Sequence, residues 1–484
     1  MRRGYAMWAG VLTLVLHVGG AGAAPDLRGL FEIGPAGCVP QGALAALLAE
    51  EPSCALDFNA CRAAPAVAAG ARLPADQVDA LATLLTRAEG DWAVRCPADG
   101  PRYLFQTALT GLAYAGAADR LDVLLALADP AVLAVVGENV RRLLAEALVW
   151  LGDPRAGPAL AAMVALPTGN PDFKPIALFG LGRLRDAGAA GTCQTLLAED
   201  ADAAVAVACV HYLAAVKAEG ALAALDKASG RHPEAVARAL ATLGGDEARP
   251  LLKRLAASGE LRVRIAAQVS LLEVGDDTFL GSLTAALQAP ERLRRERLER
   301  YKKQAKRLKK RKARKGRRGR KKRPAPVAPT RPSKALIKEM AALDLAARVA
   351  IECGRVTRPE VADRLDRALW QAARAEYELR WRAHTHALLA LAQRGDGSAV
   401  ARLAEVLAGA TDPLREALLE AVGGLWFELD APDRGRGVVA DRSLLPVLAA
   451  VADEAETHAQ RRLALRALLA VRTASAPAGA PLAP

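Results

Sequence analysis

Apolar and small residues recur along this chain at helical spacing, in segments that repeat roughly every thirty residues. Six equivalent positions mark the repeats, and the first five are 33, 32, 27 and 31 residues apart: Gly152, Arg185, Lys217, Gly244, Gly275 and Gly395. Eight residues after them stands an apolar column: Leu160, Cys193, Leu225, Leu252, Leu283 and Leu403. Five residues before them stands a column that is small in every copy but one: Ala147, Gly180, Tyr212, Ala239, Ser270 and Ala390. Eight residues before them the side chains are again small or apolar: Leu144, Ala177, Cys209, Val236, Ala267 and Ala387. This pattern predicts stacked pairs of α-helices.

The turn inside each predicted pair has its own chemistry. The marker position follows the C-terminus of the first helix, where a positive φ is common and glycine is favoured. An aspartate comes next in four copies and is expected to cap the second helix through its carboxylate: Asp153, Asp246, Asp276 and Asp396. Pro154 then stands in a first helical turn, where its missing N–H does no harm. Because one pair cannot bury its own apolar face, the pattern predicts a solenoid with a continuous core.

The composition agrees with an all-α fold. Only 4% of the 484 residues are aromatic, β-branched runs are scarce, and Ala, Leu, Gly and Arg dominate. Residues with a preference for strands are therefore too few to build a sheet core.

The repeat from Val140 to Leu160, VRRLLAEALVWLGDPRAGPAL, resembles the HEAT-like repeats first described in phycobilisome lyases. Residues 171–197, 204–225, 235–255, 262–287 and 385–407 resemble them more loosely, so the resemblance covers about half to two-thirds of the chain. It implies an α-solenoid of HEAT-like helical hairpins, here interrupted by a long basic arm. It implies little about function, because repeat scaffolds serve many unrelated tasks.

Two enzyme activities occur among proteins with such repeats, and neither is supported here. Deoxyhypusine hydroxylase uses His-Glu pairs for its metal, and this sequence contains no His-Glu dipeptide. A bilin lyase would act on cytosolic pigment proteins, from which an exported chain is separated. His384 and His386 are two residues apart and point to different faces of a helix, so they form a poor metal pair. No phosphate loop, nucleophile elbow or paired-Cys metal site occurs, so we expect neither catalysis nor a cofactor.

Residues 1–23 have the features of a secretory signal peptide. A basic start, Met1 to Arg3, precedes an apolar core from Trp8 to Val18 and a small-x-small cleavage site at Ala21 to Ala23. We expect an exported chain that is periplasmic or associated with the cell envelope. An uncleaved anchor and a chance apolar start are the alternatives. No later stretch is long and apolar enough to predict a transmembrane span in the mature chain.

Four of the seven cysteines lie close together, at Cys38, Cys54, Cys61 and Cys96. In an oxidising compartment they are candidates for two disulfides, with three connectivities open. The alternative is four free buried thiols. Cys193 and Cys209 stand in apolar columns and are expected to be core residues, while Cys353 is predicted to be a helix-borne thiol.

The sequence divides into segments by composition. We expect a signal peptide at 1–23, an N-terminal helical cap at 24–99, a HEAT-like repeat block at 100–290, a basic arm and Pro-rich linker at 291–332, a C-terminal helical repeat block at 333–473 and a disordered tail at 474–484.

The strongest functional signal is the segment from Glu291 to Arg323, which contains 21 Lys or Arg against three Glu. Its net charge of +18 exceeds the +13 of the whole chain, so all other residues sum to −5. Its first half is compatible with a helix, whereas charge repulsion from Lys309 onward and two glycines predict disorder in the absence of a polyanion. The residues expected to bind a polyanion are Lys302, Lys303, Lys306, Arg307, Lys309, Lys310, Arg311, Lys312, Arg314, Lys315, Arg317, Arg318, Arg320, Lys321, Lys322 and Arg323.

Three interpretations of this segment remain open. It is a solvated, flexible insertion, or it docks on an anionic envelope component, such as anionic lipid, lipopolysaccharide or acidic glycan. The third interpretation is nucleic-acid binding through phosphate contacts. Base stacking would contribute little to it, because Tyr301 is the one aromatic residue in the segment.

The sequence therefore favours a non-enzymatic, exported scaffold. It would bind an unidentified protein partner through the solenoid surface, and its polybasic arm would tether it to anionic envelope components. The alternatives are a nucleic-acid-binding HEAT-repeat protein and, less favoured, a HEAT-repeat lyase-type enzyme.

Overall fold

The computed structural model describes residues 58–86, 100–135, 138–167, 172–199, 202–315, 334–373, 381–410, 412–423 and 439–475. These residues are predominantly helical and contain no strand, which confirms the all-α prediction. The predicted signal peptide, the Pro-rich linker at 324–332 and the chain beyond Ser475 lie outside these ranges.

Before the arm, the chain forms α4 (Ala64–Ala69), α5 (Ala75–Thr86), α7 (Gly100–Ala115), α8 (Leu121–Leu127), α9 (Pro130–Val135), α10 (Glu138–Leu151), α11 (Gly157–Ala165), α12 (Lys174–Leu184), α13 (Ala190–Ala198), α14 (Ala203–Ala215), α15 (Ala221–Ala228), α16 (Pro233–Leu243), α17 (Arg249–Ala256) and α18 (Leu261–Glu273). The arm belongs to α19 (Leu280–Lys315). After it come α20 (Lys334–Cys353), α21 (Pro359–Ala373), α22 (Trp381–Gln393), α23 (Gly397–Gly409), α24 (Asp412–Gly423), α25 (Leu445–Asp453) and α26 (His458–Ala474). Short 3-10 turns are η2 (Phe58–Ala60), η3 (Ala118–Arg120), η4 (Pro154–Ala156), η5 (Asp246–Ala248), η6 (Asp277–Phe279) and η9 (Arg442–Leu444).

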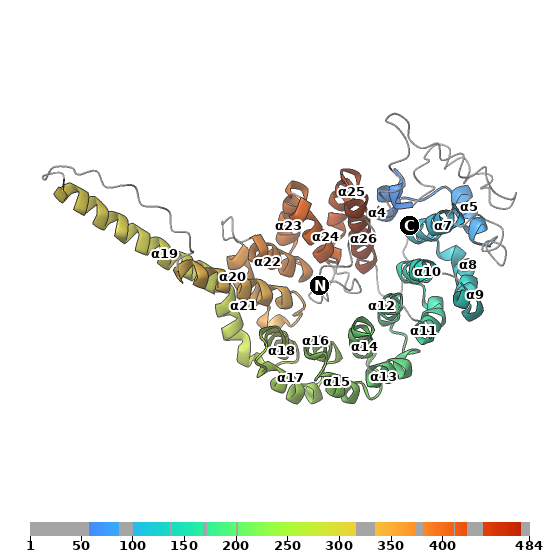
Figure 1. Cartoon of the computed structure of the whole chain (residues 1–484), viewed down its shortest axis with the longest axis horizontal. Helices are drawn as coiled ribbons and strands as arrows, with labels where there is room; N and C mark the ends of the chain where they lie inside the picture. The colour runs from blue at the N-terminus through green and yellow to red at the C-terminus, as the bar shows by residue number, and fades with distance from the viewer. Residues whose placement is uncertain are drawn as a thin grey trace.

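The helices follow one another in pairs around a ring (Figure 1). The helices α10, α12, α14, α16 and α18 pack side by side on its inner side, and α11, α13, α15 and α17 lie on its outer side. Each pair therefore buries its apolar faces against its own partner and against the neighbouring pairs.

The three predicted columns form the core. Every residue in them is buried, including the fully buried Leu160, Leu225 and Leu403 of the apolar column. The small column allows close helix approach: a Cβ added to Gly180 would lie 2.5 Å from Cγ2 of Val149 and 2.9 Å from Cδ1 of Leu160. A larger residue at Gly180 would push apart two successive units.

The turn prediction is confirmed at the marker positions and partly at the caps. All six marker residues have positive φ, including the two that are not glycine, Arg185 at 54° and Lys217 at 50°. Aspartates 153, 276 and 396 accept hydrogen bonds from backbone N–H groups of the next turn, as expected of caps. The prediction for Asp246 was wrong. A second glycine with positive φ, Gly245, takes the N-cap position there, and Asp246 becomes the first residue of η5.

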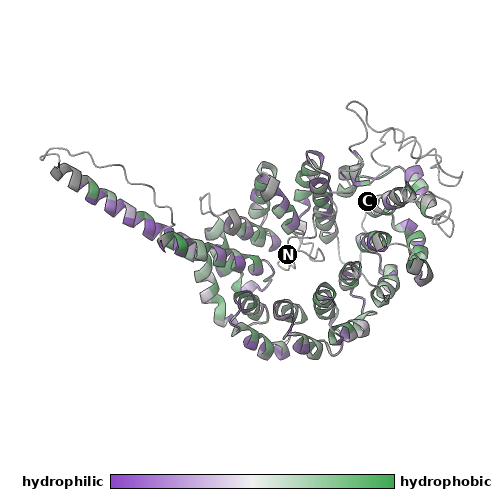
Figure 2. Ribbon diagram, in the orientation of Figure 1, coloured by the Kyte–Doolittle hydropathy of each residue, from purple (hydrophilic) through white to green (hydrophobic). Residues whose placement is uncertain are grey.

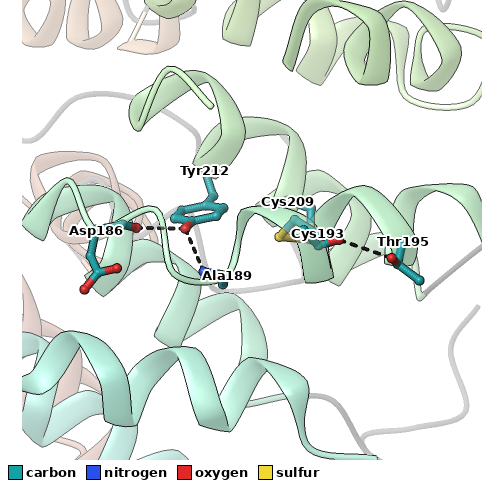
Figure 3. Close-up of a disulfide and its surroundings, with 7 residues drawn as sticks. Asp186, Ala189, Cys193, Thr195, Cys209 and Tyr212 are labelled. Carbon is teal, nitrogen blue, oxygen red and sulfur yellow. Dashed lines mark hydrogen bonds between the residues drawn. A yellow bond between two sulfur atoms is a disulfide. The ribbon is translucent and has the colours of Figure 1, made fainter. Parts of the chain in front are cut away.

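One pair of core residues has a covalent link that the sequence did not predict. Cys193 on α13 and Cys209 on α14 form a disulfide with a Cα–Cα distance of 5.2 Å (Figure 3). Both are 0% exposed, so they are core residues as expected, but they are not free. Beside them the Tyr212 hydroxyl donates to the Asp186 carbonyl at 2.8 Å and accepts from the Ala189 N–H at 3.1 Å. These contacts fasten two successive units to each other.

The helical array continues past the arm. The first residues of α19 belong to the core, with Leu280, Leu283 and Leu287 at most 2% exposed. The helix runs without interruption through Pro290, so position 290, the predicted end of the first block, is not an element boundary. Helix α20 then packs against both α19 and α18, and the order of stacked helices resumes.

Charged contacts join the helices on either side of the insertion. The Arg238 guanidinium on α16 donates to Glu352 on α20, with N–O distances of 2.5 and 3.0 Å. Arg355 donates to the Ala266 carbonyl and to the Ser270 hydroxyl of α18, each at 2.9 Å. Arg358 donates to the Leu272 carbonyl at 2.7 Å. The parts of the chain before and after the arm are therefore packed into one array.

The ring closes between its first and last described helices. Helix α4 packs against α25 and α26 as well as α7 (Figure 1). Arg461 donates to the Asn59 and Cys61 carbonyls at 2.8 Å, Arg472 donates to the Val67 and Tyr114 carbonyls at 2.9 and 3.0 Å, and Arg466 pairs with Glu146 at 2.9 Å. The helix α4 belongs to the predicted N-terminal cap, and it joins this end of the array to α26.

Candidate polyanion-binding arm

The basic segment projects from the ring as the outer part of α19 (Figure 1). Residues 291–315 of this helix span about 37 Å at 1.5 Å per residue. Hydrophilic residues dominate this projection, in contrast to the mixed colouring of the ring helices (Figure 2). A helix of this length holds its side chains well clear of the ring surface.

The half of the arm nearer to the ring offsets part of its positive charge with its own carboxylates. Glu291 pairs with Arg295 at 3.0 Å, Glu296 with Arg300 at 3.3 Å and Glu299 with Lys302 at 3.0 Å. The hydrogen bond and charge of Lys302, with further effects of Lys303 and Lys306, lower the pKa of Glu299. All three carboxylates of the segment therefore pair with basic residues between positions 291 and 302.

The beginning of α20 supports this half of the arm. Arg297 on α19 forms an ion pair with Glu339 on α20 at 2.8 Å, and the Glu339 side chain is only 2% exposed. A small apolar cluster of Leu343, Ala346 and Ala347 lies on the same helix, nearer to the ring. The arm is therefore a helix braced by a second helix over part of its length, not an isolated rod.

The outer half of the arm carries a large excess of positive charge. From Lys302 to Lys315 it contains ten Lys or Arg and no acidic residue. Lys302, Lys303, Lys306, Arg307 and Lys310 are exposed. Lys309, Arg311, Lys312, Arg314 and Lys315 lie on the same helix, and only their backbone is described. Arg317, Arg318, Arg320, Lys321, Lys322 and Arg323 lie outside the described residues.

The helix continues further than the sequence predicted. Disorder was expected from Lys309, but the structure is helical to Lys315 and the described helix ends just before Gly316. The reason lies in composition, because Lys, Arg and Ala are strong helix formers that offset part of the charge repulsion.

Exposed apolar side chains stand among these cations. Leu298, Tyr301 and Leu308 on α19 are 42%, 53% and 57% exposed, and Ile337 and Met340 on α20 are 53% and 49% exposed. The three α19 residues are spaced so that they fall on one side of the helix. A solvated spacer has no need of such a stripe.

The other chemically reactive residues do not form a site around the arm. Cys61 is disulfide-bonded. Cys38, Cys54 and Cys96 lie outside the described residues, so the connectivity of the predicted disulfides stays a prediction. Cys353 is a free buried thiol, and burial raises its pKa to about 12. Burial also lowers the pKa of His384. Within the described ranges, no group of three or more His, Cys, Asp or Glu is placed to hold a metal ion, and no helix is long and apolar enough to cross a membrane.

Comparisons with known proteins do not identify the chain. No family model and no curated protein matches it. Among solved structures, the crystal structure of an engineered protein aligns over 88% of this chain and 97% of its own, with 15% identity and a TM-score of 0.25. A likeness at that score carries no argument.

Proposed function

We propose that this protein is an exported, non-enzymatic scaffold, in which a ring of HEAT-like hairpins holds a protein partner and the α19 arm tethers the ring to an anionic surface of the cell envelope. The observation that carries the proposal is the outer half of the arm, with ten cations, no carboxylate and a helical backbone that projects from the ring. Beyond Lys302, which pairs with Glu299, the charge of the outer half is available to an external partner, because this half contains no carboxylate of its own.

Anionic lipid is the polyanion that this arm fits best. Each Lys or Arg near an anionic bilayer contributes about 1 kcal/mol of binding energy. Tyr301, Leu298 and Leu308 add exposed apolar side chains on the same helix, and these gain energy at a lipid interface. Duplex nucleic acid offers phosphates but no apolar phase for such residues.

The disulfides support the export part of the proposal. Cys61 is disulfide-bonded and Cys193 is linked to Cys209. Structural disulfides persist in oxidising compartments and are rare in the cytosol. A chain with such links is suited to the periplasm or the cell surface.

The test is sedimentation with lipid vesicles across a salt series. Vesicles of phosphatidylcholine with phosphatidylglycerol should retain the protein at low salt and release it as salt rises, while pure phosphatidylcholine should retain little. Replacing Lys302, Lys303, Lys306 and Lys310 with Gln should weaken binding by about 100- to 1000-fold, from about 1 kcal/mol per charge. Deleting Lys302 to Arg323 should abolish salt-sensitive retention.

The matched control replaces the same four lysines with Arg, which keeps both charge and helix propensity and should bind like the natural chain. Retention that survives the deletion would contradict the tether. A parallel titration with duplex DNA covers the alternative: tighter binding to DNA than to the anionic vesicles would favour a nucleic-acid function instead.

A further inference from the structure

A small pocket lies where the helices before and after the arm meet, between α16, α18 and α20. Glu234 and Arg238 line it from α16, one helical turn apart. They lie on the opposite side of α16 from Val236 and Leu240, which are fully buried. Because the outer helices α15 and α17 pack on α16, we place the pocket on the inner side of the ring (Figure 1).

The pocket has more positive charge than its own carboxylates can neutralise. Three arginines line it, Arg238, Arg262 and Arg348, against two glutamates, Glu234 and Glu352. Glu352 is shared between Arg238, at 2.5 Å, and a fourth arginine, Arg355, at 2.9 Å. Glu234 also binds Arg238, at 2.5 Å. Four arginines therefore face two carboxylates that are both already engaged.

Arg348 is the cation in this group with spare hydrogen-bonding capacity. It is half-buried on α20, and no hydrogen bond or ion pair joins its side chain to any residue of the described chain. A guanidinium presents a planar fork of N–H donors that matches a carboxylate or another small oxyanion. Here the guanidinium of Arg348 lies at the wall of the pocket.

The charges around the pocket also act on a neighbouring histidine. Burial, together with the charges of Arg238 and Arg355, lowers the pKa of His211 to about 4, although Glu352 acts in the opposite direction. The arginines thus outweigh the carboxylate at a position on the adjacent helix α14.

We propose that this pocket binds one carboxylate group presented by the protein partner, either an acidic side chain or a chain terminus, with Arg348 as its main ligand. The proposal rests on the scaffold function above and names the chemistry of the partner. The pocket is too small for a sugar ring or a base. Ile265 and Ile351 form apolar walls that suit the methylene stem of a glutamate or the methyl group of a terminal residue.

Isoleucine methyl NMR offers a direct test, because the whole chain contains five isoleucines. Ile265 and Ile351 line the pocket, Ile176 lies in the core and Ile337 is exposed near the start of α20. Protein labelled at the Ile δ1 methyls would be titrated into the high millimolar range with two probes, N-acetylglutamate N-methylamide and N-acetylalanine. The first carries only a side-chain carboxylate and the second only a terminal one, so the tighter probe identifies the source. N-acetylglutamine N-methylamide, sodium chloride and inorganic phosphate serve as comparisons.

We expect the Ile265 and Ile351 signals to shift with at least one carboxylate probe and not with the glutamine analogue, while Ile176 stays in place. Arg348→Gln should weaken that binding at least about tenfold, and Arg348→Lys should fall between, since it keeps the charge but loses the fork. An unchanged Ile176 signal and an unchanged midpoint of thermal unfolding would show that each variant is folded.

The proposal is overturned if neither carboxylate shifts the two signals, if the glutamine analogue shifts them equally, or if Arg348→Gln binds as before. Tighter binding of inorganic phosphate would also overturn it. The chain lacking Lys302 to Arg323 should give the same shifts. Failure of the vesicle experiment and failure of this one are therefore distinguishable.

Discussion

The ring and the arm use the same basic residues in opposite ways. In the ring, Arg238, Arg466 and Arg472 are at most 8% exposed and bind carboxylates or backbone carbonyls of distant helices. In the outer arm, Lys303, Lys306 and Arg307 are exposed and form no ion pair with a carboxylate of the described residues. Charge that is buried and paired fixes the fold, whereas charge that is exposed and unpaired is available to a partner. The difference lies in burial and local acids, not in residue type.

The largest expected effect is the removal of a carboxylate from the ring. Glu352→Gln leaves Arg238 and Arg355 without the carboxylate that they share, in a site where both side chains of the Arg238–Glu352 pair are at most 7% exposed. Breaking a buried pair in this way should lower the free energy of unfolding by about 3–5 kcal/mol, measured by urea titration. The control is Glu405→Gln, which breaks an exposed pair with Arg402 and should change it by less than about 1 kcal/mol. Similar losses of unfolding free energy in the two variants would contradict the distinction between buried and exposed charges.

The next effect comes from the disulfide between α13 and α14. Replacing Cys193 and Cys209 with Ala opens a link between residues 16 apart in sequence. A loop of this size restricts the unfolded chain enough to stabilise the fold by about 3 kcal/mol. The double variant should lose that amount in urea unfolding, and reducing agent should destabilise the natural chain more than the variant. An equal response to reducing agent would count against the link.

A smaller effect is expected from pH. The folded-state pKa of His211, about 4, lies below its ordinary value of 6.5, because of burial and then the charges of Arg238 and Arg355. As pH falls, the unfolded chain binds the proton first, so this contribution to stability is complete above about pH 6.5 and is lost as pH falls toward about 4. Between neutral pH and about pH 5, the natural chain should lose about 1–2 kcal/mol more than His211→Gln. Urea unfolding at both pH values measures the difference, and parallel losses would contradict it.

The smallest effect on stability is expected from the arm. Replacing Lys302, Lys303, Lys306 and Lys310 with Gln removes exposed charges, among them the like-charged i,i+4 neighbours 302/306 and 306/310. The free energy of unfolding should change by less than about 0.5 kcal/mol. A loss comparable to that of Glu352→Gln would mean that the arm is part of the fold rather than a free cationic surface.

Much of the ring could be predicted from the sequence, because its repeats are local. The columns that contain Leu160, Ala147 and Leu144 depend only on helical spacing, and each is buried as predicted. The prediction of a positive φ at the marker positions was also correct at Arg185 and Lys217, where the residue type itself does not indicate it. The features that recur about every thirty residues are set by contacts between neighbouring units, so they appear in the sequence as a periodic pattern.

Contacts between residues that are far apart in the sequence produce no such periodic pattern. The pairing of Arg466 with Glu146, and of Arg461 with carbonyls near Phe58, spans most of the chain and appears once. The ion pair of Arg297 with Glu339 depends on how α20 lies beside the arm. The link between Cys193 and Cys209 could have been suspected, because they belong to facing columns of successive units. For the arm, the sequence identified the cations but not the helix that carries Lys309 to Lys315.

Closure of the ring sets a rule for its size. An open array can gain or lose a unit at little structural cost, because only the ends move. Here an added or missing unit would change the circumference, and α26 would no longer meet α4. The chain can therefore gain residues without opening the ring only as an insertion that extends away from the ring and returns to it at the same place. The α19–α20 hairpin is such an insertion, since it extends outward from the ring and leaves the number of units in the ring unchanged (Figure 1).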